Sequence, residues 1–403
     1  MKILWISDAL CLFTGFGTQS YAMLKHLAKS HEVRQLGWFA HHEMDYEGIP
    51  VYPLGKGFGD SAEIKAYYKE FNPDIVISLG DVQMVEKLVY EMEDYVFRSK
   101  WIHWLPVDGE PYPEIFDDQI QNMEHLVVLS DFGYDVYKDK VKTGLYKIYH
   151  GIDQELYRPI EDKNILRAKQ GLHNRFACLM VAQNQWRKNI PAMIEAFAKF
   201  AKDKKNVDLI IHTKPVSVGA AQGWNIYELI GQHNLSGKVR ISAESYTPVK
   251  MNRLYNCANL FVSSSQGEGF GLPHVEAMMS GVPLLLPDYT TSREQILPDN
   301  DETRRCGELI KVASFQTQSG VNIKRAIIDT DDCAEKLQMY YEDWLQGETK
   351  LRRYGRMARQ NAIKRYEITK ITREWDALIH KIARWQKSSI LQSTKLPVTL
   401  TTL

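Results

Sequence analysis

The sequence lacks a charge imbalance, since its 403 residues contain 50 Lys and Arg and 50 Asp and Glu. A balanced chain has no net field that would draw it to nucleic acid, so we expect no nucleic-acid partner. The sequence also has no run of about 18–20 apolar residues, the length that spans a bilayer. Asp8 interrupts the apolar N-terminal run, so we do not expect a signal peptide. These absences predict a soluble cytoplasmic protein, with a peripheral contact to a membrane surface left open.

Cysteine and metal-binding patterns are also scarce. The five cysteines are widely spaced, and neither Cys-x-x-Cys nor His-Glu-x-x-His occurs. This excludes a disulfide framework and the common zinc sites, and it predicts free thiols in a reducing compartment. Asp-x-Asp occurs at Asp299 and Asp301, in a polar loop, and at Asp329 and Asp331, where we expect Asp331 or Asp332 to cap a helix. We therefore predict that no metal ion is required.

Short apolar runs alternate with amphipathic segments along most of the chain. The predicted strands of the first part are residues 2–7, 74–79, 101–107 and 125–129, and the predicted helices are residues 18–29 and 81–92. Residues 157–175 are charged and contain a proline, so we interpret them as a linker, after which the alternation restarts. This pattern predicts an α/β protein with two doubly wound, Rossmann-like parallel-sheet domains. From about Asp331 the chain becomes helical, and residues 386–403 show no period that would predict regular structure.

The segment GEGFGLPHVEAMMSGVP lies between two predicted strands, residues 259–264 and 282–287. Pro273 suits the first turn of a helix, and Gly281 suits its end. Glycines before a helix let the backbone approach a ligand, and the helix N-terminus adds partial positive charge. The turn therefore predicts a site for a diphosphate. Its predicted contacts are Gly269, Phe270, Gly271 and Leu272.

Two glutamates bracket this turn. Glu276 lies one turn into the predicted helix, where its carboxylate could accept hydrogen bonds from a ribose diol. Glu268 lies at the start of the turn, where it could hold sugar hydroxyls or stabilise positive charge at an anomeric carbon. Either residue alone could be a solvated acid or could complement the helix dipole. The pair together predicts a nucleotide-sugar site.

The segment EGFGLPHVEAMMSGVPLLLPD resembles the E-x7-E signature of retaining GT-B glycosyltransferases of the family 4 type. Four other segments resemble this family in its order and approximate spacing: TGFGTQSYAMLKHLA, IYHGIDQELYRP, VAQNQWRKNIPAMIEAF and LYNCANLFVSSSQ. The resemblance extends to about Trp385. It implies an N-terminal acceptor domain, residues 1–157, and a C-terminal donor domain, residues 158–367. It also implies that the two domains face a cleft and that the last helices, about residues 368–403, cross back to the first domain.

Arg187 and Lys188 follow the predicted strand that opens the second domain. Ligands bind at the carboxyl ends of strands in doubly wound sheets, so these cations could neutralise a leaving diphosphate. The resemblance implies this role for Lys188. The family often has Gly-Arg where this sequence has Ala182 and Gln183, and we expect Arg187 to replace that arginine.

The loop TGFG after the first strand contains Gly15 and Gly17. A dinucleotide fingerprint fails because Ser20 occupies the third glycine position and no acidic residue ends the second strand. We therefore expect Gly15 and Gly17 to contact the donor or the acceptor at the cleft. His103 is either a catalytic residue near the transferred sugar or a packed histidine within a strand, and Asp108 beside it is an expected acceptor contact.

The sequence thus predicts an enzyme that transfers a sugar from a UDP- or GDP-sugar to an acceptor hydroxyl with retention, without a metal or another cofactor. Tyr246 is the expected contact of the base, and Glu268, Lys188, Arg187 and His103 are the expected catalytic residues. The acceptor classes left open are a glycan, a lipid-linked sugar, a protein and a small molecule. The alternatives are an epimerase or phosphorylase of the same architecture, or a non-catalytic nucleotide- or glycan-binding protein.

Overall fold

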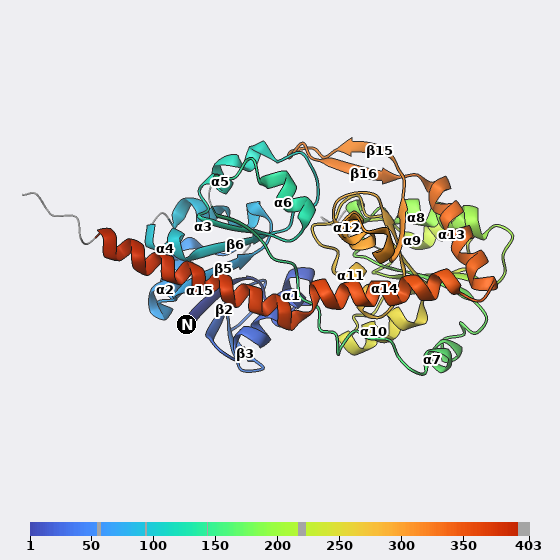
Figure 1. Cartoon of the computed structure of the whole chain (residues 1–403), viewed down its shortest axis with the longest axis horizontal. Coiled ribbons are helices and arrows are strands. Elements are labelled where there is room, and N and C mark those ends of the chain that lie inside the picture. The colour runs from blue at the N-terminus through green and yellow to red at the C-terminus, as the bar shows by residue number, and fades with distance from the viewer. Residues whose placement is uncertain (55–57, 93–94, 143, 217–222, 394–403) are drawn as a thin grey trace, which may run out of the picture.

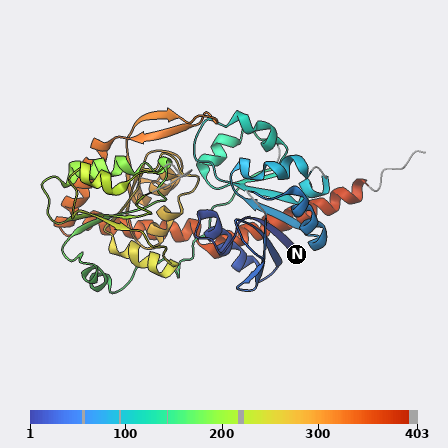
Figure 2. The ribbon, with the colours of Figure 1, turned by 180° about the vertical axis from the view of Figure 1, so that it is seen from behind.

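The computed structural model describes residues 1–54, 58–92, 95–142, 144–216 and 223–393. These residues form two lobes that lie side by side along the long axis of the molecule (Figure 1). Each lobe contains a parallel sheet with helices on its faces, which confirms the predicted fold class. Seen from behind, the last helices run along both lobes (Figure 2).

The first lobe contains an eight-stranded sheet in the order β3-β4-β2-β1-β5-β6-β7-β8, and only the pair β3–β4 is antiparallel. Strands β5 and β6 are buried at every position, which is why they appear in the sequence as continuous apolar runs. The strands are β1 (Lys2–Asp8), β2 (Glu32–Trp38), β3 (Met44–Tyr46), β4 (Ile49–Pro53), β5 (Ile75–Leu79), β6 (Trp101–Leu105), β7 (His125–Val128) and β8 (Gly144–Lys147). The helices are α1 (Gly15–Leu27), α2 (Ser61–Phe71), α3 (Glu86–Glu91), α4 (Tyr95–Lys100), α5 (Asp117–Gln121) and α6 (Asp131–Tyr137).

The second lobe contains a six-stranded sheet, all of whose pairs are parallel, in the order β11-β10-β9-β12-β13-β14. Its strands are β9 (Phe176–Val181), β10 (Val207–His212), β11 (Val239–Ser242), β12 (Leu260–Val262), β13 (Leu284–Pro287) and β14 (Gly307–Ile310). Its helices are α7 (Lys163–Lys169), α8 (Ile190–Ala201), α9 (Ile226–Gln232), α10 (Pro248–Cys257), α11 (Leu272–Met279), α12 (Thr291–Ile296) and α13 (Thr330–Leu345).

Three local predictions need correction. Residues 157–175 are not only a linker, because they contain α7, whose Arg167 is buried and donates to backbone carbonyls. Residues 81–92 form a 3-10 turn before α3 instead of one helix. Helix α13 is capped by Asp329 and not by Asp331 or Asp332. The Asp329 carboxylate precedes the first turn and accepts from the N–H groups of both later residues.

An antiparallel hairpin that the sequence did not predict connects β14 to α13. It is formed by β15 (Val312–Thr317) and β16 (Lys324–Ile328). In Figure 1 the hairpin lies at the top of the second lobe and its turn reaches toward the first lobe.

The chain ends in two long helices, α14 (Thr349–Tyr366) and α15 (Ile368–Ser393). Helix α14 packs on α11 in the second lobe, and α15 packs on α1 and α4 in the first, so the predicted crossing is confirmed. Trp375 of α15 is fully buried, with its ring 4.9 Å from that of Trp104. Residues 386–393 continue α15, so the expectation of no regular structure there was wrong for these residues. They can be helical without an apolar period because adding a residue to an existing helix costs little free energy. Residues 394–403 lie outside the described part.

All five cysteines are free thiols, as the sequence predicted, and only Cys11 is partly exposed. No helix within the described residues is both long enough and apolar enough to cross a bilayer.

Candidate active site

Two loops of the second lobe bring the predicted charged residues together. Arg187 and Lys188 follow β9, and Glu268 follows the neighbouring strand β12. Lys188 Nζ lies 2.5 Å from Glu268 Oε1, and Arg187 Nη1 lies 3.4 Å from Oε2 of the same carboxylate. The side chains of Lys188 and Glu268 are 15% and 12% exposed. Ser264 holds the loops together, since its hydroxyl donates to the carbonyl oxygens of Lys188 and Asn189.

Burial and charge act in opposite directions on this cluster. Burial alone would raise the pKa of Glu268, but the charges of Lys188 and Arg187 outweigh it and hold that pKa well below its usual range. The pKa of Lys188 is also lowered, because burial and the adjacent Arg187 together outweigh Glu268. Glu268 is therefore an ionised carboxylate that two cations compensate.

The turn after Glu268 presents its N–H groups and fixes its carbonyl groups. Gly271 has a φ of +76°, which favours glycine, and α11 begins at Leu272. The carbonyl oxygen of Phe270 accepts from Gln295 Nε2 at 2.5 Å and from the Thr291 hydroxyl at 3.3 Å. Among the described hydrogen bonds, the N–H groups of Phe270, Gly271 and Leu272 donate to no protein group. Three free amides at a helix N-terminus are suited to bind an anion.

The side chain of Phe270 is not available to a ligand, because it is only 4% exposed. Its ring packs edge-on against the rings of His150, at 5.1 Å, and Tyr366, at 5.4 Å. His150 ends the first lobe and Tyr366 ends α14. Only the backbone of Phe270 is therefore open to a ligand, and its ring fixes the turn against the junction between the lobes.

Glycines let the two lobes approach each other at this turn. A Cβ on Gly269 would lie 2.6 Å from Pro106 Cβ, and a Cβ on Gly267 would overlap the carbonyl oxygen of Asp108. A Cβ on Gly15 would lie 3.8 Å from Leu272 Cδ1, so the N-terminal glycine loop faces the start of α11. The structure therefore brings Gly15 next to the predicted diphosphate turn.

Gly17 has a local role in the N-terminal loop. A Cβ there would lie 2.5 Å from the carbonyl oxygen of Leu12, so only glycine fits. The N–H of Gly17 donates to Thr14 Oγ1 at 3.0 Å, and that hydroxyl donates to Asp8 Oδ2 at 2.5 Å. Burial raises the pKa of Asp8, although its bond with Thr14 opposes the rise. Gly17 thus shapes the loop, and its contact with the donor stays a prediction.

Glu276 lies within α11 and is 8% exposed. Its Oε2 accepts from the Tyr255 hydroxyl at 2.6 Å, and the Tyr157 hydroxyl is a second partner. Burial raises the pKa of Glu276 to about 7, and the two tyrosines only partly oppose this rise. The hydroxyls of Tyr255 and Tyr157 thus hold the carboxyl group in place, and the sequence analysis identified neither of them.

The first lobe contributes carboxylates from the ends of adjacent strands. Asp108 follows β6; its Oδ2 lies 3.5 Å from Arg187 Nε, and its Oδ1 lies 3.0 Å from Arg325 Nη1. Asp81 follows β5, and burial, followed by the charge of Asp108, raises its pKa to about 6. The predicted Asp108 is therefore in the cluster. Asp81 and Arg325 were missed, although Asp81 lies two residues after the end of a predicted strand and could have been noticed for that reason.

His274 is a further neighbour of the cluster that the sequence analysis missed. It is 3% exposed, and its Nδ1 lies 2.9 Å from Gln295 Oε1. Burial lowers the pKa of His274, while the charge of Glu268 opposes this effect. Its place two residues before Glu276, one turn from Gly271, was the available signal.

His103 is not brought to the charged cluster. It is fully buried within β6, its Nδ1 lies 2.8 Å from the Ser78 hydroxyl, and burial lowers its pKa to about 3. This placement agrees with the packed alternative and leaves no described contact with Glu268, so a catalytic role stays a prediction. Tyr246 follows the edge strand β11, with its ring 4.8 Å from that of His212.

Neither Asp-x-Asp pair faces the turn. Asp299 pairs with Arg304 and Arg365, and Asp301 caps a short 3-10 turn. No group of three or more His, Cys, Asp or Glu in the described part is arranged to hold a metal ion. Metal-independent transfer stays a prediction.

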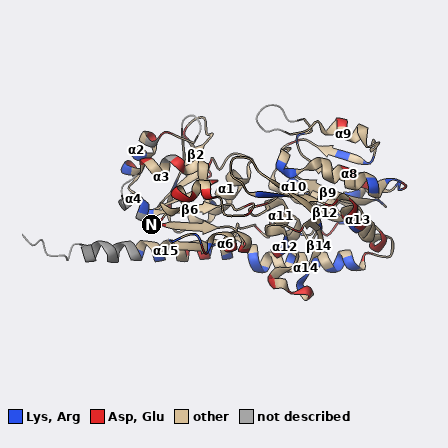
Figure 3. Ribbon diagram, turned by 90° about the horizontal axis from the view of Figure 1, so that it is seen from above, with Lys and Arg blue, Asp and Glu red and all other residues tan. Residues whose placement is uncertain are grey.

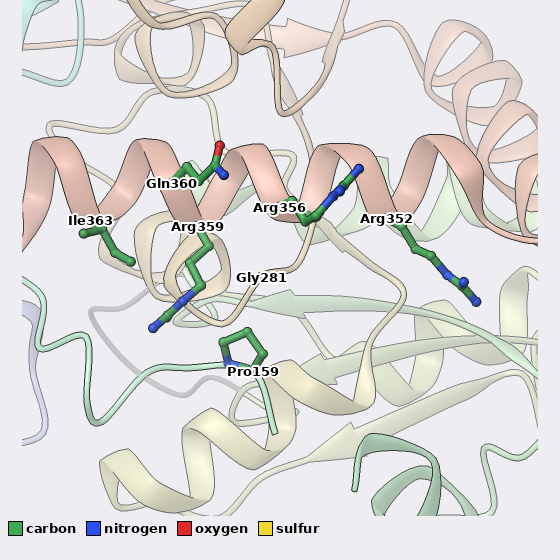
Figure 4. Close-up of a pocket in the computed structure, with 8 residues that line it drawn as sticks. Pro159, Gly281, Arg352, Arg356, Arg359, Gln360 and Ile363 are labelled. Atoms are coloured by element: carbon green, nitrogen blue, oxygen red, sulfur yellow. The ribbon is translucent and has the colours of Figure 1, made fainter. Parts of the chain in front are cut away.

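A surface cavity of about 720 Å³ lies beside α14, away from the charged cluster. It is lined by Pro159, Gly281, Arg352, Gly355, Arg356, Arg359, Gln360 and Ile363. Basic residues recur along α14 (Figure 3). However, the arginines point in different directions, with Arg359 toward Pro159 and Arg352 away from it (Figure 4). Arg359 already donates to the carbonyl oxygens of Tyr157 and Met279. None of the predicted site residues lines this cavity, and its arginines do not converge on one point.

Comparisons with known proteins bear on the fold and on the family of the second lobe. Residues 162–342 match the family model described as "Glycosyl transferases group 1". The O-antigen chain mannosyltransferase B of Escherichia coli is 28% identical over 343 residues, which cover 73% of this chain and 84% of that protein. Other curated relatives, mannosyltransferases and sucrose synthases, match over only 13–20% of their own length.

Solved structures resemble nearly the whole chain. Sucrose-phosphate synthase from Thermosynechococcus elongatus superposes with a TM-score of 0.77 at 16% identity, covering 95% of this chain and 99% of that chain. The Anabaena protein HepE in complex with UDP and glucose gives a TM-score of 0.72 at 16% identity, covering 94% and 100%. The chain therefore has the GT-B fold, and residues 162–342 match the family model of group 1 glycosyl transferases.

Proposed function

We propose that this chain transfers a sugar from a nucleotide-diphosphate sugar to an acceptor hydroxyl with retention of anomeric configuration, as a glycosyltransferase of the family 4 type. The observation that carries the proposal is the position of Arg187, Lys188 and Glu268 beside three unpaired backbone amides. Two cations and a helix N-terminus match the charge of a diphosphate. The carboxylate beside them matches the hydroxyls and the developing positive charge of the sugar.

In the proposed reaction, the bond between the anomeric carbon and the diphosphate oxygen breaks, and the acceptor oxygen bonds to that carbon on the same face. The acceptor proton passes to the leaving diphosphate. Arg187 and Lys188 neutralise the charge that builds on this leaving group. Glu276 accepts hydrogen bonds from the ribose hydroxyls of the nucleotide. When the donor binds, Glu268 gives up its ion pair with Lys188 and binds the sugar hydroxyls instead.

The donor is tested first. UDP, GDP, their glucose and mannose derivatives and free ADP as control are compared by thermal shift, because HepE was solved with UDP-glucose and several relatives are named mannosyltransferases. A ligand at 100 times its Kd should stabilise the protein by about 2.7 kcal/mol. The anomeric configuration of the product is then read by proton NMR.

The outcomes separate this proposal from its alternatives. Conversion of the nucleotide sugar to its epimer without any acceptor would indicate an epimerase, and turnover that requires free phosphate would indicate a phosphorylase. Nucleotide binding without turnover across glycan, lipid-linked, peptide and small-molecule acceptors would indicate a non-catalytic binding protein. An inverted product would contradict retention.

A further inference from the structure

Strand β16 belongs to the second lobe in sequence but lies between loops of both lobes. The N–H of Lys324 donates to the carbonyl oxygen of Glu110 in the first lobe at 2.6 Å. Two residues later, the N–H of Ala326 donates to the carbonyl oxygen of Gln266 at 2.9 Å, and Gln266 leads directly into the donor turn. The strand therefore joins the loop after β6 to the segment that carries Glu268.

Tyr289, after β13, strengthens the same junction. Its hydroxyl donates to the carbonyl oxygen of Lys324 at 3.0 Å and accepts from the N–H of Glu110 at 3.1 Å. A Cβ on Gly109 would lie 2.9 Å from the Lys324 carbonyl oxygen, so the loop and the strand are in close contact. These contacts form a clasp between the lobes, which we define as residues 106–111 and residues 323–327.

Arg325 lies at the centre of the clasp and is 4% exposed. Its Nη1 donates to the carbonyl oxygen of Asp108 at 2.6 Å and lies 3.0 Å from the carboxylate Oδ1 of the same residue. Its Nε donates to Gln318 Oε1 at 2.8 Å, and its guanidinium lies 6.0 Å from the centroid of the Trp186 ring. The planar guanidinium thus fixes both the backbone and the side chain of Asp108.

Asp108 is shared between two cations. Arg325 Nη1 is 3.0 Å from one carboxylate oxygen, and Arg187 Nε is 3.5 Å from the other. Arg187 also contacts Glu268 at 3.4 Å, so the charges alternate from the hairpin to the donor turn. A donor diphosphate that binds Arg187 would draw this cation away from Asp108. Arg325 would then be the remaining cationic partner of Asp108 among the contacts of the described residues.

We propose that Arg325 is a positioning residue for the transfer step. It holds Asp108, the expected acceptor contact, beside Arg187 and keeps the clasp closed while Arg187 binds the donor. Arg325 acts through Asp108 and the loop backbone, and it does not touch the donor. The kinetic part of this inference rests on the proposed function, whereas the clasp itself depends only on the contacts between the lobes.

The kinetic test compares Arg325→Lys and Arg325→Gln with the unchanged chain, titrating donor and acceptor separately. We expect the donor KM to stay within about 2-fold and kcat/KM for the acceptor to fall about 10-fold or more, because small misplacements of reacting groups are costly. Hydrolysis of the donor relative to transfer should rise at least about 5-fold, because an open cleft admits water. Arg293→Gln is the control, since Arg293 is 62% exposed and pairs with Asp288 within its own lobe.

The second test does not need activity. Hydrogen exchange is followed in peptides that cover residues 106–111 and 323–327, and we expect about 10-fold faster exchange in Arg325→Gln than in Arg293→Gln. Unchanged exchange together with an unchanged ratio of hydrolysis to transfer would overturn the proposal. An equal loss of donor affinity would overturn it in favour of direct donor binding. If no variant turns over a nucleotide sugar, the proposed function fails, and the exchange result still decides whether Arg325 closes the clasp.

Discussion

Lys188 Nζ lies 2.5 Å from Glu268 Oε1, although the two residues are 80 positions apart in the chain. The loop after β9 carries the cation, and the loop after β12 carries the carboxylate. Strands β9 and β12 are neighbours in one parallel sheet. Both groups are largely removed from water, so each depends on the other for charge compensation.

Substitution at this ion pair should separate catalysis from stability. We expect Glu268→Ala and Lys188→Ala each to lower transfer by about 100-fold or more, because each removes a group that faces developing charge. Lys188→Ala should also lower the free energy of unfolding by about 3 kcal/mol, because Glu268 stays buried with only the more distant Arg187. Steady-state rates and urea denaturation measure the two effects.

The double variant Lys188→Met with Glu268→Gln is the control for the stability part. It should recover most of the lost stability and none of the activity, because it removes both charges at once. Turnover near that of the unchanged chain in either alanine variant would contradict the catalytic roles.

Donor affinity should depend on pH through Glu276. Burial raises the pKa of this residue to about 7, so its carboxyl group is largely protonated at pH 6 and largely ionised at pH 8. The ionised form accepts two ribose hydroxyls better than the protonated form, so UDP or GDP should bind more tightly as the pH rises across this range. Calorimetric titration at several pH values checks this, and Glu276→Gln should flatten the curve.

The same group makes a prediction about stability. Its pKa is about 7 in the folded chain and near 4.5 when unfolded, so the folded state holds the extra proton between these values. The contribution of Glu276 to the free energy of unfolding is therefore fully present below about pH 4.5 and is lost as the pH rises to about 7. The free energy of unfolding should fall over this range by at most about 3 kcal/mol. Glu276→Gln should remove this slope from the unfolding free energy, and an unchanged slope would count against the raised pKa.

The close contact at Gly267 should tolerate no side chain. Gly267→Ala places a Cβ on top of the carbonyl oxygen of Asp108, so the turn and the first lobe must separate. A displacement of about 1 Å near reacting groups can lower turnover by about 100-fold, so we expect a loss of that order in kcat. Gly231→Ala is the matched control, because a Cβ there meets nothing within 4 Å. Equal rates in the two variants would show that the contact is unimportant for turnover.

The return of the chain to the first lobe should be strongly stabilising. Trp375 of α15 is fully buried against Trp104, so Trp375→Ala should lower the free energy of unfolding by about 3–5 kcal/mol. Arg373→Ala, on the exposed side of the same helix, should have little effect. Chemical denaturation measures both, and similar values for the two variants would contradict the packing role of α15.

The parts that the sequence predicted well share a local signal. Buried parallel strands such as β5 and β9 appear as continuous apolar runs, and Lys188 and Glu268 lie in the loops that follow β9 and β12. Because the carboxyl ends of parallel strands lie at one edge of a sheet, their meeting could be inferred from position alone. Gly269 and Gly271 could also be identified from the sequence, since glycines before a helix mark a backbone that must approach another group.

The parts that were missed have no such signal. Strand β15 is exposed or half-exposed at all of its positions, so its sequence shows no apolar pattern, and the hairpin depends on pairing and on contacts with distant loops. Arg325 meets Asp108 across 217 positions, a contact that no local spacing encodes. His103 shows a different case, because a polar residue in an apolar strand could indicate either a site or a packed core residue. The structure buries it and gives its Nδ1 a partner in Ser78, and its catalytic role stays a prediction.

The crossing of α15 has a consequence for how this protein is made and recombined. Ile371, Trp375, Ile379 and Ile382 belong to the same apolar cluster as β1 and β5, so the N-terminal lobe cannot complete its core until the final part of the chain has left the ribosome. Vectorial folding from the N-terminus is therefore interrupted in this molecule. A chimaera that exchanges the C-terminal halves of two relatives would have to retain residues 368–393 of the parent that supplies the first half.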